Sequence, residues 1–310
     1  MTPLKVTDAS PASHSVAKLG SLDFWRSFAP DFHIADPSYL SGHDGITLSP
    51  AQQERVAAQI RDDGYVQASV DWGLDFARMA DAVRALSAAG LSPAFAYLYD
   101  EFWIPFYRLH FIISGLLGGS YVMLPDFWVW NVEPAKGDSG WKPHRDRGYQ
   151  ALLEDRSAKS VTAWIPLSRA TPLNSCMYIV PATLDPTYGT KDDWDWKFEY
   201  PSIRALPAQP GDFLIWNQAV LHWGSKSSPL GDASRVSMAF EFQRADIEPF
   251  NNPVIAPLSI LPFERRLQLI AKQILQYWHM YTVDPHLKEF AQSLQPASEL
   301  PPPFPSSGPG

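Results

Sequence analysis

The chain has 310 residues, of which 45% are hydrophobic and 19% are charged, and its 25 basic and 33 acidic side chains give a formal net charge of −8. This composition is typical of a soluble globular chain with a sizeable core, and the acidic balance argues against a nucleic-acid partner. The single cysteine, Cys176, excludes an intrachain disulfide.

No segment predicts a membrane span or a secretory signal. The most apolar segment, 102–118, is interrupted by Pro105, Arg108 and His110, which makes it too short and too polar to cross a bilayer. Residues 1–15 are polar and lack the apolar stretch of a signal peptide. Together with the lone cysteine, which fits a reducing compartment, these features predict a cytoplasmic protein with no membrane partner and no obligate protein partner.

The first third of the chain predicts helices. Residues 1–45 show no sustained periodicity and are expected to form an extended N-terminal lead-in. Ser49, Pro50 and Gln52 then form a capping-box signature for a helix that stops near residue 64, followed by a short strand at Tyr65 and Val66. Two further helices are predicted over about 74–89 and 98–117, the second with a kink at Pro105.

After residue 119 the pattern changes to short segments rich in aromatic and β-branched residues, separated by Pro, Gly and Asn turns. Short strands without interleaved helices predict an antiparallel sandwich or jelly roll. Residues 185–209 are polar and predict a long loop. The expected strands are 121–124, 127–132, 160–167, 177–180, 212–216 and 235–243.

The C-terminal part predicts one helix over about 262–281, because apolar residues recur there at helical spacing. The Pro/Ser-rich segment 293–310 predicts disorder. The expected organisation is therefore an N-terminal extension at 1–45, a main domain of helices and strands at 46–255, a C-terminal helix that packs on it within 256–292, and a disordered tail at 293–310.

Three residues suggest a metal site. His144 and Asp146 are two positions apart, so they would share one face of a strand, and His222 follows 78 positions after His144. Two imidazoles and one carboxylate form the set that holds a non-haem Fe(II) and leaves coordination positions open. A lone histidine is more often a surface or hydrogen-bonded core residue, so this prediction depends on the residues that accompany it.

One accompanying feature is an anion-binding pattern. Segment 235–242 alternates with period two, which places Arg235 and Ser237 on one face of a strand. A buried arginine requires an anionic partner, and a dicarboxylate cosubstrate would supply it, with Ser237 adding a hydroxyl. A salt bridge to a protein carboxylate is the alternative. Asn131 offers an amide to a carboxylate oxygen, although a hydrogen-bonded amide at the end of a strand explains it equally well.

Several segments together resemble the phytanoyl-CoA dioxygenase-like family over about residues 48–245. The resemblance implies a double-stranded β-helix (a jelly-roll, cupin-like fold) preceded by helices, and it implies that 46–255 is an Fe(II)- and 2-oxoglutarate-dependent oxygenase domain, an oxidoreductase. The segments are Asp63–Val66, His144–Asp146, Val161–Leu167, Ile179–Pro181 and Gly211–Trp216 leading to His222.

By this resemblance His144, Asp146 and His222 are the catalytic iron ligands, and Arg235 binds the distal carboxylate of 2-oxoglutarate. Ser237 and Asn131 match helper positions; the latter is placed like an asparagine of the ectoine hydroxylases. The cofactors implied are Fe(II), 2-oxoglutarate and O₂. Related halogenases have a small residue in place of Asp146, so the implied reaction is hydroxylation of an unactivated C–H of a small organic metabolite, with release of succinate and CO₂.

The sequence leaves the substrate and the final outcome open. Desaturation or ring closure in specialised metabolism would use the same cofactors, and a non-catalytic jelly-roll binding module or a Zn- or Mn-dependent hydrolase or isomerase would use the same fold or ligands. The chain departs from the family pattern at 182–184 and 223–226. Candidate substrate-side residues, each with an equally good structural explanation, are Trp141, Arg145, Tyr149, Trp194 and Trp223.

Overall fold

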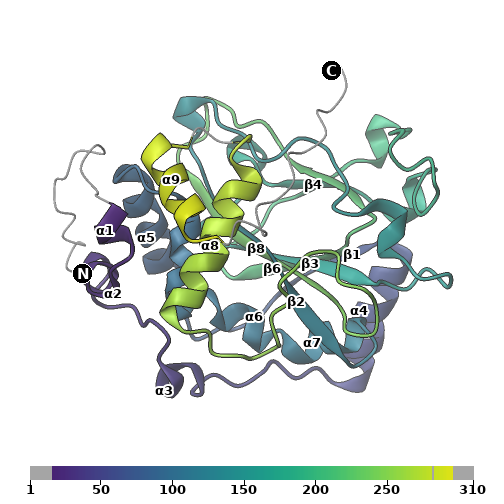
Figure 1. Cartoon of the computed structure of the whole chain (residues 1–310). Helices are drawn as coiled ribbons and strands as arrows, with labels where there is room; N and C mark the ends of the chain where they lie inside the picture. Colours follow the sequence, from purple (N-terminus) through teal and green to yellow (C-terminus); the bar gives the residue numbers. More distant parts are fainter. Residues whose placement is uncertain (1–15, 281–282, 296–310) are drawn as a thin grey trace.

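Two antiparallel sheets form the centre of the protein in a computed structural model that describes residues 16–280 and 283–295. The larger sheet has the strand order β1-β6-β3-β8-β2 and the smaller one the order β5-β4-β7, and Figure 1 shows β4 opposite the larger sheet. The strands are β1 (Tyr65–Ser69), β2 (Tyr121–Val132), β3 (Ser160–Pro166), β4 (Met177–Val180), β5 (Arg204–Leu206), β6 (Asp212–Asn217), β7 (Leu221–Gly224) and β8 (Arg235–Arg244).

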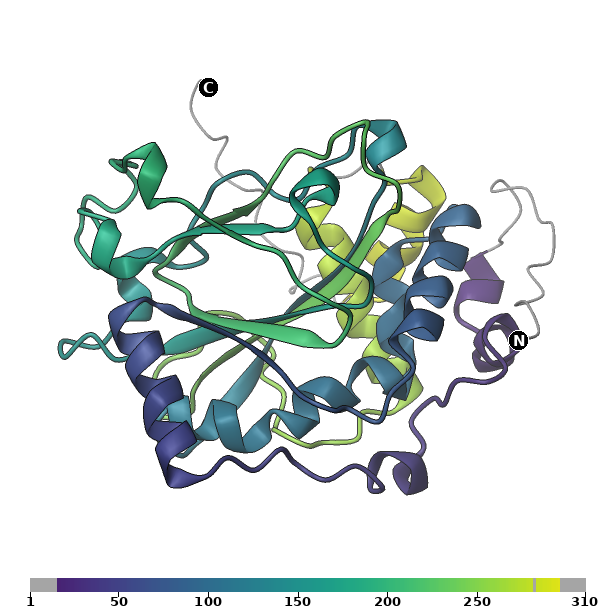
Figure 2. The same ribbon diagram turned by 180° about the vertical axis from the view of Figure 1, so that it is seen from behind.

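Helices cover the outer face of the larger sheet (Figures 1 and 2). They are α1 (Val16–Leu19), α2 (Leu22–Phe28), α3 (Pro37–Leu40), α4 (Pro50–Asp62), α5 (Phe76–Ala88), α6 (Ile104–Arg108), α7 (His110–Leu116), α8 (Phe263–Tyr277) and α9 (Pro285–Ser293). None of the helices in the described part of the chain is long and apolar enough to cross a membrane.

The alternation along β8 separates two hydrophobic clusters. Val236, Met238, Phe240 and Phe242 belong to the cluster shared with the helices. Ala239, on the other face, belongs to the cluster between the two sheets, together with Trp164 of β3, Leu214 of β6 and Ile179 of β4. The period-two prediction for this strand is therefore confirmed, and it leaves the polar residues of β8 facing the space between the sheets.

Most of the predicted elements are present. Ser49 and Gln52 form the expected capping box at the start of α4. The strand expected at Tyr65 and Val66 is β1, and the six further expected strands form β2, β3, β4, β6 and β8, because the two segments at 121–132 are merged into one strand. Two strands were missed because each has only three or four residues: β5 lies inside the predicted loop 185–209, and β7 contains His222.

Three helix predictions need correction. The lead-in forms α1 to α3 rather than an extended segment, and Trp25 of α2 is completely buried in the core. The predicted helix 98–117 is broken into α6, α7 and a 3₁₀ turn, η3 (Asp100–Phe102), because Pro105 lies in the first turn of a new helix. The C-terminal segment forms two helices, α8 and α9. The predicted disordered tail lies, from residue 296 on, outside the described residues.

Candidate metal centre

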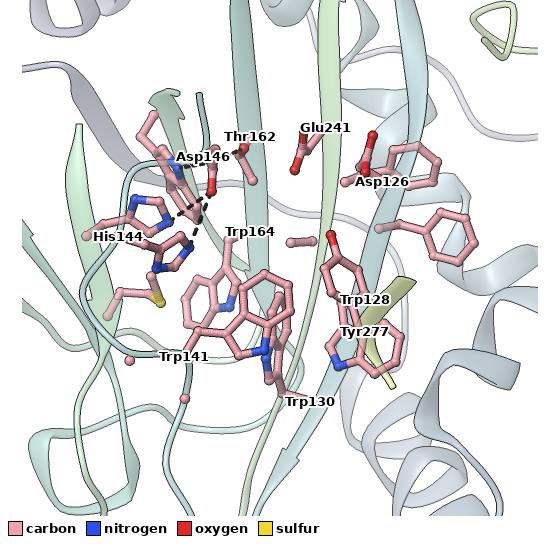
Figure 3. Close-up of a pocket in the computed structure, with 18 of the residues that line it drawn as sticks. Asp126, Trp128, Trp130, Trp141, His144, Asp146, Thr162, Trp164, Glu241 and Tyr277 are labelled. Carbon is pink, nitrogen blue, oxygen red and sulfur yellow. Dashed lines mark hydrogen bonds and ion pairs between the residues drawn. The ribbon is translucent and has the colours of Figure 1, made fainter. Parts of the chain in front are cut away.

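His144, Asp146 and His222 meet at one point between the sheets. Their potential ligand atoms all lie within 4.8 Å of one another, and Figure 3 shows the ring of His144 directed at the carboxylate of Asp146. The backbones of His144 and His222 form an isolated antiparallel bridge, with hydrogen bonds of 3.0 Å in each direction. This bridge brings together residues that are far apart in the sequence.

The local structure around His144 differs from the prediction. Residues 143–147 form a bend with a single bridge rather than a regular strand, so strand alternation does not explain why His144 and Asp146 meet. The bridge to β7 positions His144, and side-chain contacts position Asp146. Likewise His222 lies within β7 rather than in a turn.

Backbone carbonyls orient both histidine rings. Nδ1 of His144 lies 2.6 Å from the carbonyl oxygen of Lys142, and Nδ1 of His222 lies 3.1 Å from that of Val220. A carbonyl accepts only a donor, so each Nδ1 carries the proton and each Nε2 presents a lone pair. The two Nε2 atoms lie 3.4 and 3.5 Å from Oδ1 of Asp146. Within the described residues, Nε2 of His144 is buried and makes no hydrogen bond.

One carboxylate oxygen of Asp146, Oδ1, faces the two histidine rings. Its Oδ2 accepts hydrogen bonds from Oγ1 of Thr162 at 2.8 Å and Nε1 of Trp216 at 3.0 Å. Burial alone would raise the pKa of this carboxyl, but His222 and His144 hold it well below its ordinary value. Burial also lowers the pKa of His222 to about 4. Burial would lower the pKa of His144 as well, but Asp146 raises it above the ordinary value. Two imidazoles beside a carboxylate are a donor set that fits a divalent ion.

Arg235 lies in the same cavity and is only 1% exposed. Its guanidinium donates to the hydroxyl of Ser237 and to Oγ of Ser175 at 3.3 Å. It also lies over the ring of Trp164, 5.9 Å from the centroid. Ser175 was missed because it follows a 3₁₀ turn in which no sequence pattern indicates a ligand.

The cavity has an empty volume, mouth included, of about 530 Å³. Trp141, a predicted substrate residue, lines it. Three further polar lining residues were missed. The period-two pattern places Glu241 on the same face as Arg235, so the sequence did indicate that Glu241 could line the cavity. No sequence pattern indicated this for Asp126 or Tyr277. The aromatic lining consists of Phe127, Trp128, Trp130, Trp141, Trp164, Trp216, Phe240 and Tyr277.

The prediction that Asn131 binds 2-oxoglutarate needs correction, because the structure places this residue away from the predicted site. It pairs with Val236, the neighbour of Arg235 that faces the helices. Its side chain donates to Glu133 at 3.4 Å, and it lines a separate hollow beside Ile274 of α8 and Leu287 of α9. The register between β2 and β8 decides this outcome, and the sequence alone does not reveal it.

Arg145 is also not available to a substrate. It is 2% exposed, forms an ion pair of 2.6 Å with Asp185, and donates to the carbonyl oxygens of Asp193 and Ala219 at 2.7 Å each. These contacts fasten the loop after β4 to the turn before β7. Arg145 is therefore a structural residue placed between two candidate ligands.

The other predicted substrate residues lie outside the cavity. Tyr149 borders a different hollow, beside Leu152 and Gly189. Trp194 is 62% exposed. Trp223 stacks with Tyr178, with ring centroids 5.9 Å apart, across the outer face of the smaller sheet. The structure therefore brings only Trp141 of this group to the metal ligands.

The model of the phytanoyl-CoA dioxygenase (PhyH) family matches residues 91–229, a segment that contains all three candidate ligands. Over this segment the chain matches the phytanoyl-CoA dioxygenase-like family. A search of curated protein sequences finds no match. The predicted family is thus confirmed by the part of the chain that forms the metal centre.

Solved structures show the same fold. The epimerase SnoN in complex with Fe³⁺, alpha ketoglutarate and nogalamycin RO is 20% identical, covers 68% of this chain and 97% of its own, and has a TM-score of 0.50. The apo form of the non-heme monooxygenase ThoJ is 14% identical, covers 77% of this chain and 99% of its own, and also has a TM-score of 0.50. The cupin-like fold class predicted for this phytanoyl-CoA dioxygenase-like protein is confirmed, although the predicted helix count is not.

As a phytanoyl-CoA dioxygenase-like protein, the chain is an Fe(II)- and 2-oxoglutarate-dependent oxygenase. The alternatives of a non-catalytic binding module and of a hydrolase or isomerase with another metal are therefore set aside.

Proposed function

We propose that this oxygenase hydroxylates an unactivated C–H of a small organic metabolite, with release of succinate and CO₂. In this proposal His144, Asp146 and His222 bind Fe(II), and Arg235 with Ser237 binds 2-oxoglutarate. The observation that supports it best is that one cavity contains the three converging ligand atoms, a buried guanidinium and an aromatic wall.

The protein would hold the iron through a rigid set of contacts. The carbonyls of Lys142 and Val220 keep each imidazole in the tautomer that binds a metal. Thr162 and Trp216 bind the second oxygen of Asp146, which directs the first oxygen at the iron. Fe(II) bound here supplies O₂ activation at the coordination positions that the three protein ligands leave open.

Arg235 would orient the cosubstrate. A guanidinium binds a carboxylate through two parallel hydrogen bonds, which fixes direction as well as position. The hydroxyls of Ser237 and Ser175 hold this guanidinium, and the ring of Trp164 lies beside it. The distal carboxylate of 2-oxoglutarate would therefore bind at Arg235 and direct the keto-acid end at the iron.

The aromatic wall would position the substrate and exclude water. Five tryptophans and Tyr277 line the cavity, and large rings bury an organic molecule while keeping few rotatable bonds. Exclusion of water protects the oxidising centre from side reactions.

Desaturation and ring closure remain alternative outcomes with the same cofactors. The two solved structures of similar fold, an epimerase and a monooxygenase, show that the fold is used for more than one reaction. Product analysis by mass spectrometry distinguishes the outcomes: hydroxylation adds one oxygen atom to the product, whereas the other two remove two hydrogen atoms.

Anaerobic titration tests the proposal. The protein with Fe(II) and 2-oxoglutarate should develop a visible charge-transfer band, which His144→Ala should abolish while the far-ultraviolet circular dichroism stays unchanged. Folded, iron-loaded protein that shows no band with 2-oxoglutarate would overturn the assignment of these ligands.

A further inference from the structure

The end of the cavity away from Arg235 is acidic. Asp126 of β2 and Glu241 of β8 both line it, and Figure 3 shows their carboxylates beyond Asp146, across the cavity from the histidines. Nη2 of Arg147 lies 3.4 Å from Asp126 and 3.0 Å from Glu241. Among the described residues, no other cationic side chain forms an ion pair with either carboxylate.

Two carboxyl groups thus share one guanidinium, so one of them lacks a cationic partner whenever both are ionised. Arg147 does not line the cavity; it lies behind the carboxylates, with its guanidinium 5.4 Å from the ring centroid of Phe250. A molecule in the cavity would therefore meet the carboxylates rather than the guanidinium. At the other end of the cavity each charged side chain would have its own partner. The carboxylate of Asp146 would face the iron, and the guanidinium of Arg235 would face a carboxylate of the cosubstrate.

The two carboxylates have different surroundings. Asp126 accepts hydrogen bonds from the side-chain amides of Asn251 at 2.9 Å and Gln276 at 2.7 Å, so its charge is well stabilised. Glu241 lacks such a set of donors, and burial, opposed only in part by Arg147, raises its pKa to about 8. This is the response of a carboxyl group that lacks a counter-charge.

Aromatic rings line the cavity between its two ends. The rings of Trp130 and Trp141 are 5.2 Å apart at 72°, those of Trp141 and Tyr277 are 4.8 Å apart at 50°, and those of Trp128 and Tyr277 are 5.1 Å apart at 74°. Figure 3 shows the hydroxyl of Tyr277 directed toward the two carboxylates. The face of an aromatic ring attracts cations, most strongly for tryptophan.

We infer that the substrate carries a protonated primary or secondary amine, whose N–H groups bind Glu241 and the hydroxyl of Tyr277, while the rest of the molecule lies against the aromatic rings of the cavity. This inference rests on the proposed function, because it places another part of the same molecule beside the iron. Beside a neutral substrate Glu241 would keep its proton, whereas an ammonium group would stabilise its carboxylate form, and an anion would be repelled by Asp126.

Calorimetric titration of three related compounds tests the inference. Phenethylamine, 2-phenylethanol and phenylacetate share a ring and a short chain but differ in charge. We expect the anaerobic protein, loaded with Fe(II) and 2-oxoglutarate, to bind the amine about 10- to 100-fold more tightly than the alcohol, and the acetate most weakly. Equal affinities for amine and alcohol would overturn the inference.

The order of addition separates this inference from the proposed function. 2-Oxoglutarate binding is measured first on the same sample. If it does not bind, the proposed function fails; if it binds and the amine is not preferred, only the inference on substrate class fails.

Substitutions test whether Glu241 and Tyr277 bind the amine. Glu241→Gln keeps the size of the side chain but removes its charge, so the amine should lose its advantage over the alcohol. Glu248→Gln, at an exposed position, is the matched control and should keep it. If Glu241→Gln does not fold, Tyr277→Phe still tests the site, because it should weaken amine binding several-fold; an unchanged affinity would contradict the role given to the hydroxyl.

Discussion

The indole Nε1 of Trp216 donates a hydrogen bond of 3.0 Å to Oδ2 of Asp146, so a residue of β6 orients a candidate iron ligand located on a separate bend. The orientation of Asp146 thus depends on the larger sheet as well as on its own backbone.

Trp216→Phe should therefore weaken iron binding without removing a ligand. It keeps an aromatic ring but deletes the donor, and loss of such an outer contact costs about 10- to 100-fold in metal affinity. Competition titration of Fe(II) under argon measures this loss. Trp194→Phe, at an exposed position, is the control, and equal affinities of the two variants would show that the hydrogen bond has no effect on the iron.

Removal of a candidate ligand should abolish turnover. Asp146→Ala leaves two imidazoles without a carboxylate, so we expect no succinate above background although the protein remains folded. His286→Ala, whose side chain is 78% exposed, should keep full activity. Succinate release is measured by mass spectrometry, and retained turnover in Asp146→Ala would exclude this residue as a ligand.

Loss of Arg235 should affect the cosubstrate rather than the metal. Arg235→Ala should raise the KM for 2-oxoglutarate by about 30-fold or more, because truncation of a buried charged partner costs about 2–5 kcal/mol. Arg235→Lys keeps the charge but loses the two-pronged geometry, so its KM should be intermediate. Iron affinity is the internal control. Arg61→Ala on α4, half exposed, should behave as wild type.

Arg145 should matter for stability. Arg145→Ala leaves Asp185 buried and unpaired, which costs about 3–5 kcal/mol in the free energy of unfolding. Urea denaturation followed by fluorescence measures the change, and limited proteolysis should cut the loop 185–193 faster. Lys197→Ala breaks an exposed pair with Asp195 and should change the stability by less than about 0.5 kcal/mol.

Glu241 should make stability depend on pH. Its pKa in the folded protein, about 8, lies above the ordinary value of 4.5, so the folded state holds a proton that the unfolded state releases between these two values. The contribution of Glu241 to stability is therefore complete below pH 4.5 and is lost as the pH rises through 8. Urea unfolding at pH 5.5 and 8.5 should show a smaller decrease for Glu241→Gln than for wild type; equal decreases would contradict the raised pKa.

Local patterns predicted much of the fold and the core of the site. The alternation of residues 235–242 placed Arg235 and Ser237 on the face that lines the cavity, and Ser49 with Gln52 marked the start of α4, because both signals depend only on neighbouring residues. Histidine and aspartate spacing identified the candidate ligands, although the reason for their convergence is a backbone bridge that no local pattern encodes.

Long-range packing decided the rest. Asn131 lies on the wrong face because strand register is set between β2 and β8, over 100 residues apart. Arg145 is inaccessible because the loop after β4 folds over it. Tyr277 resembled any other residue of an amphipathic helix, and only the position of α8 brings it to the cavity.

Tyr277 and the two amides that hold Asp126 come from residues 251–277, beyond the segment that matches the family model. Part of the cavity wall is thus encoded in a stretch of the chain separate from the one that holds the candidate metal ligands. Exchange of residues 251–277 between relatives should alter substrate specificity and leave oxygen activation intact. New specificities can then arise by recombination as well as by point mutation.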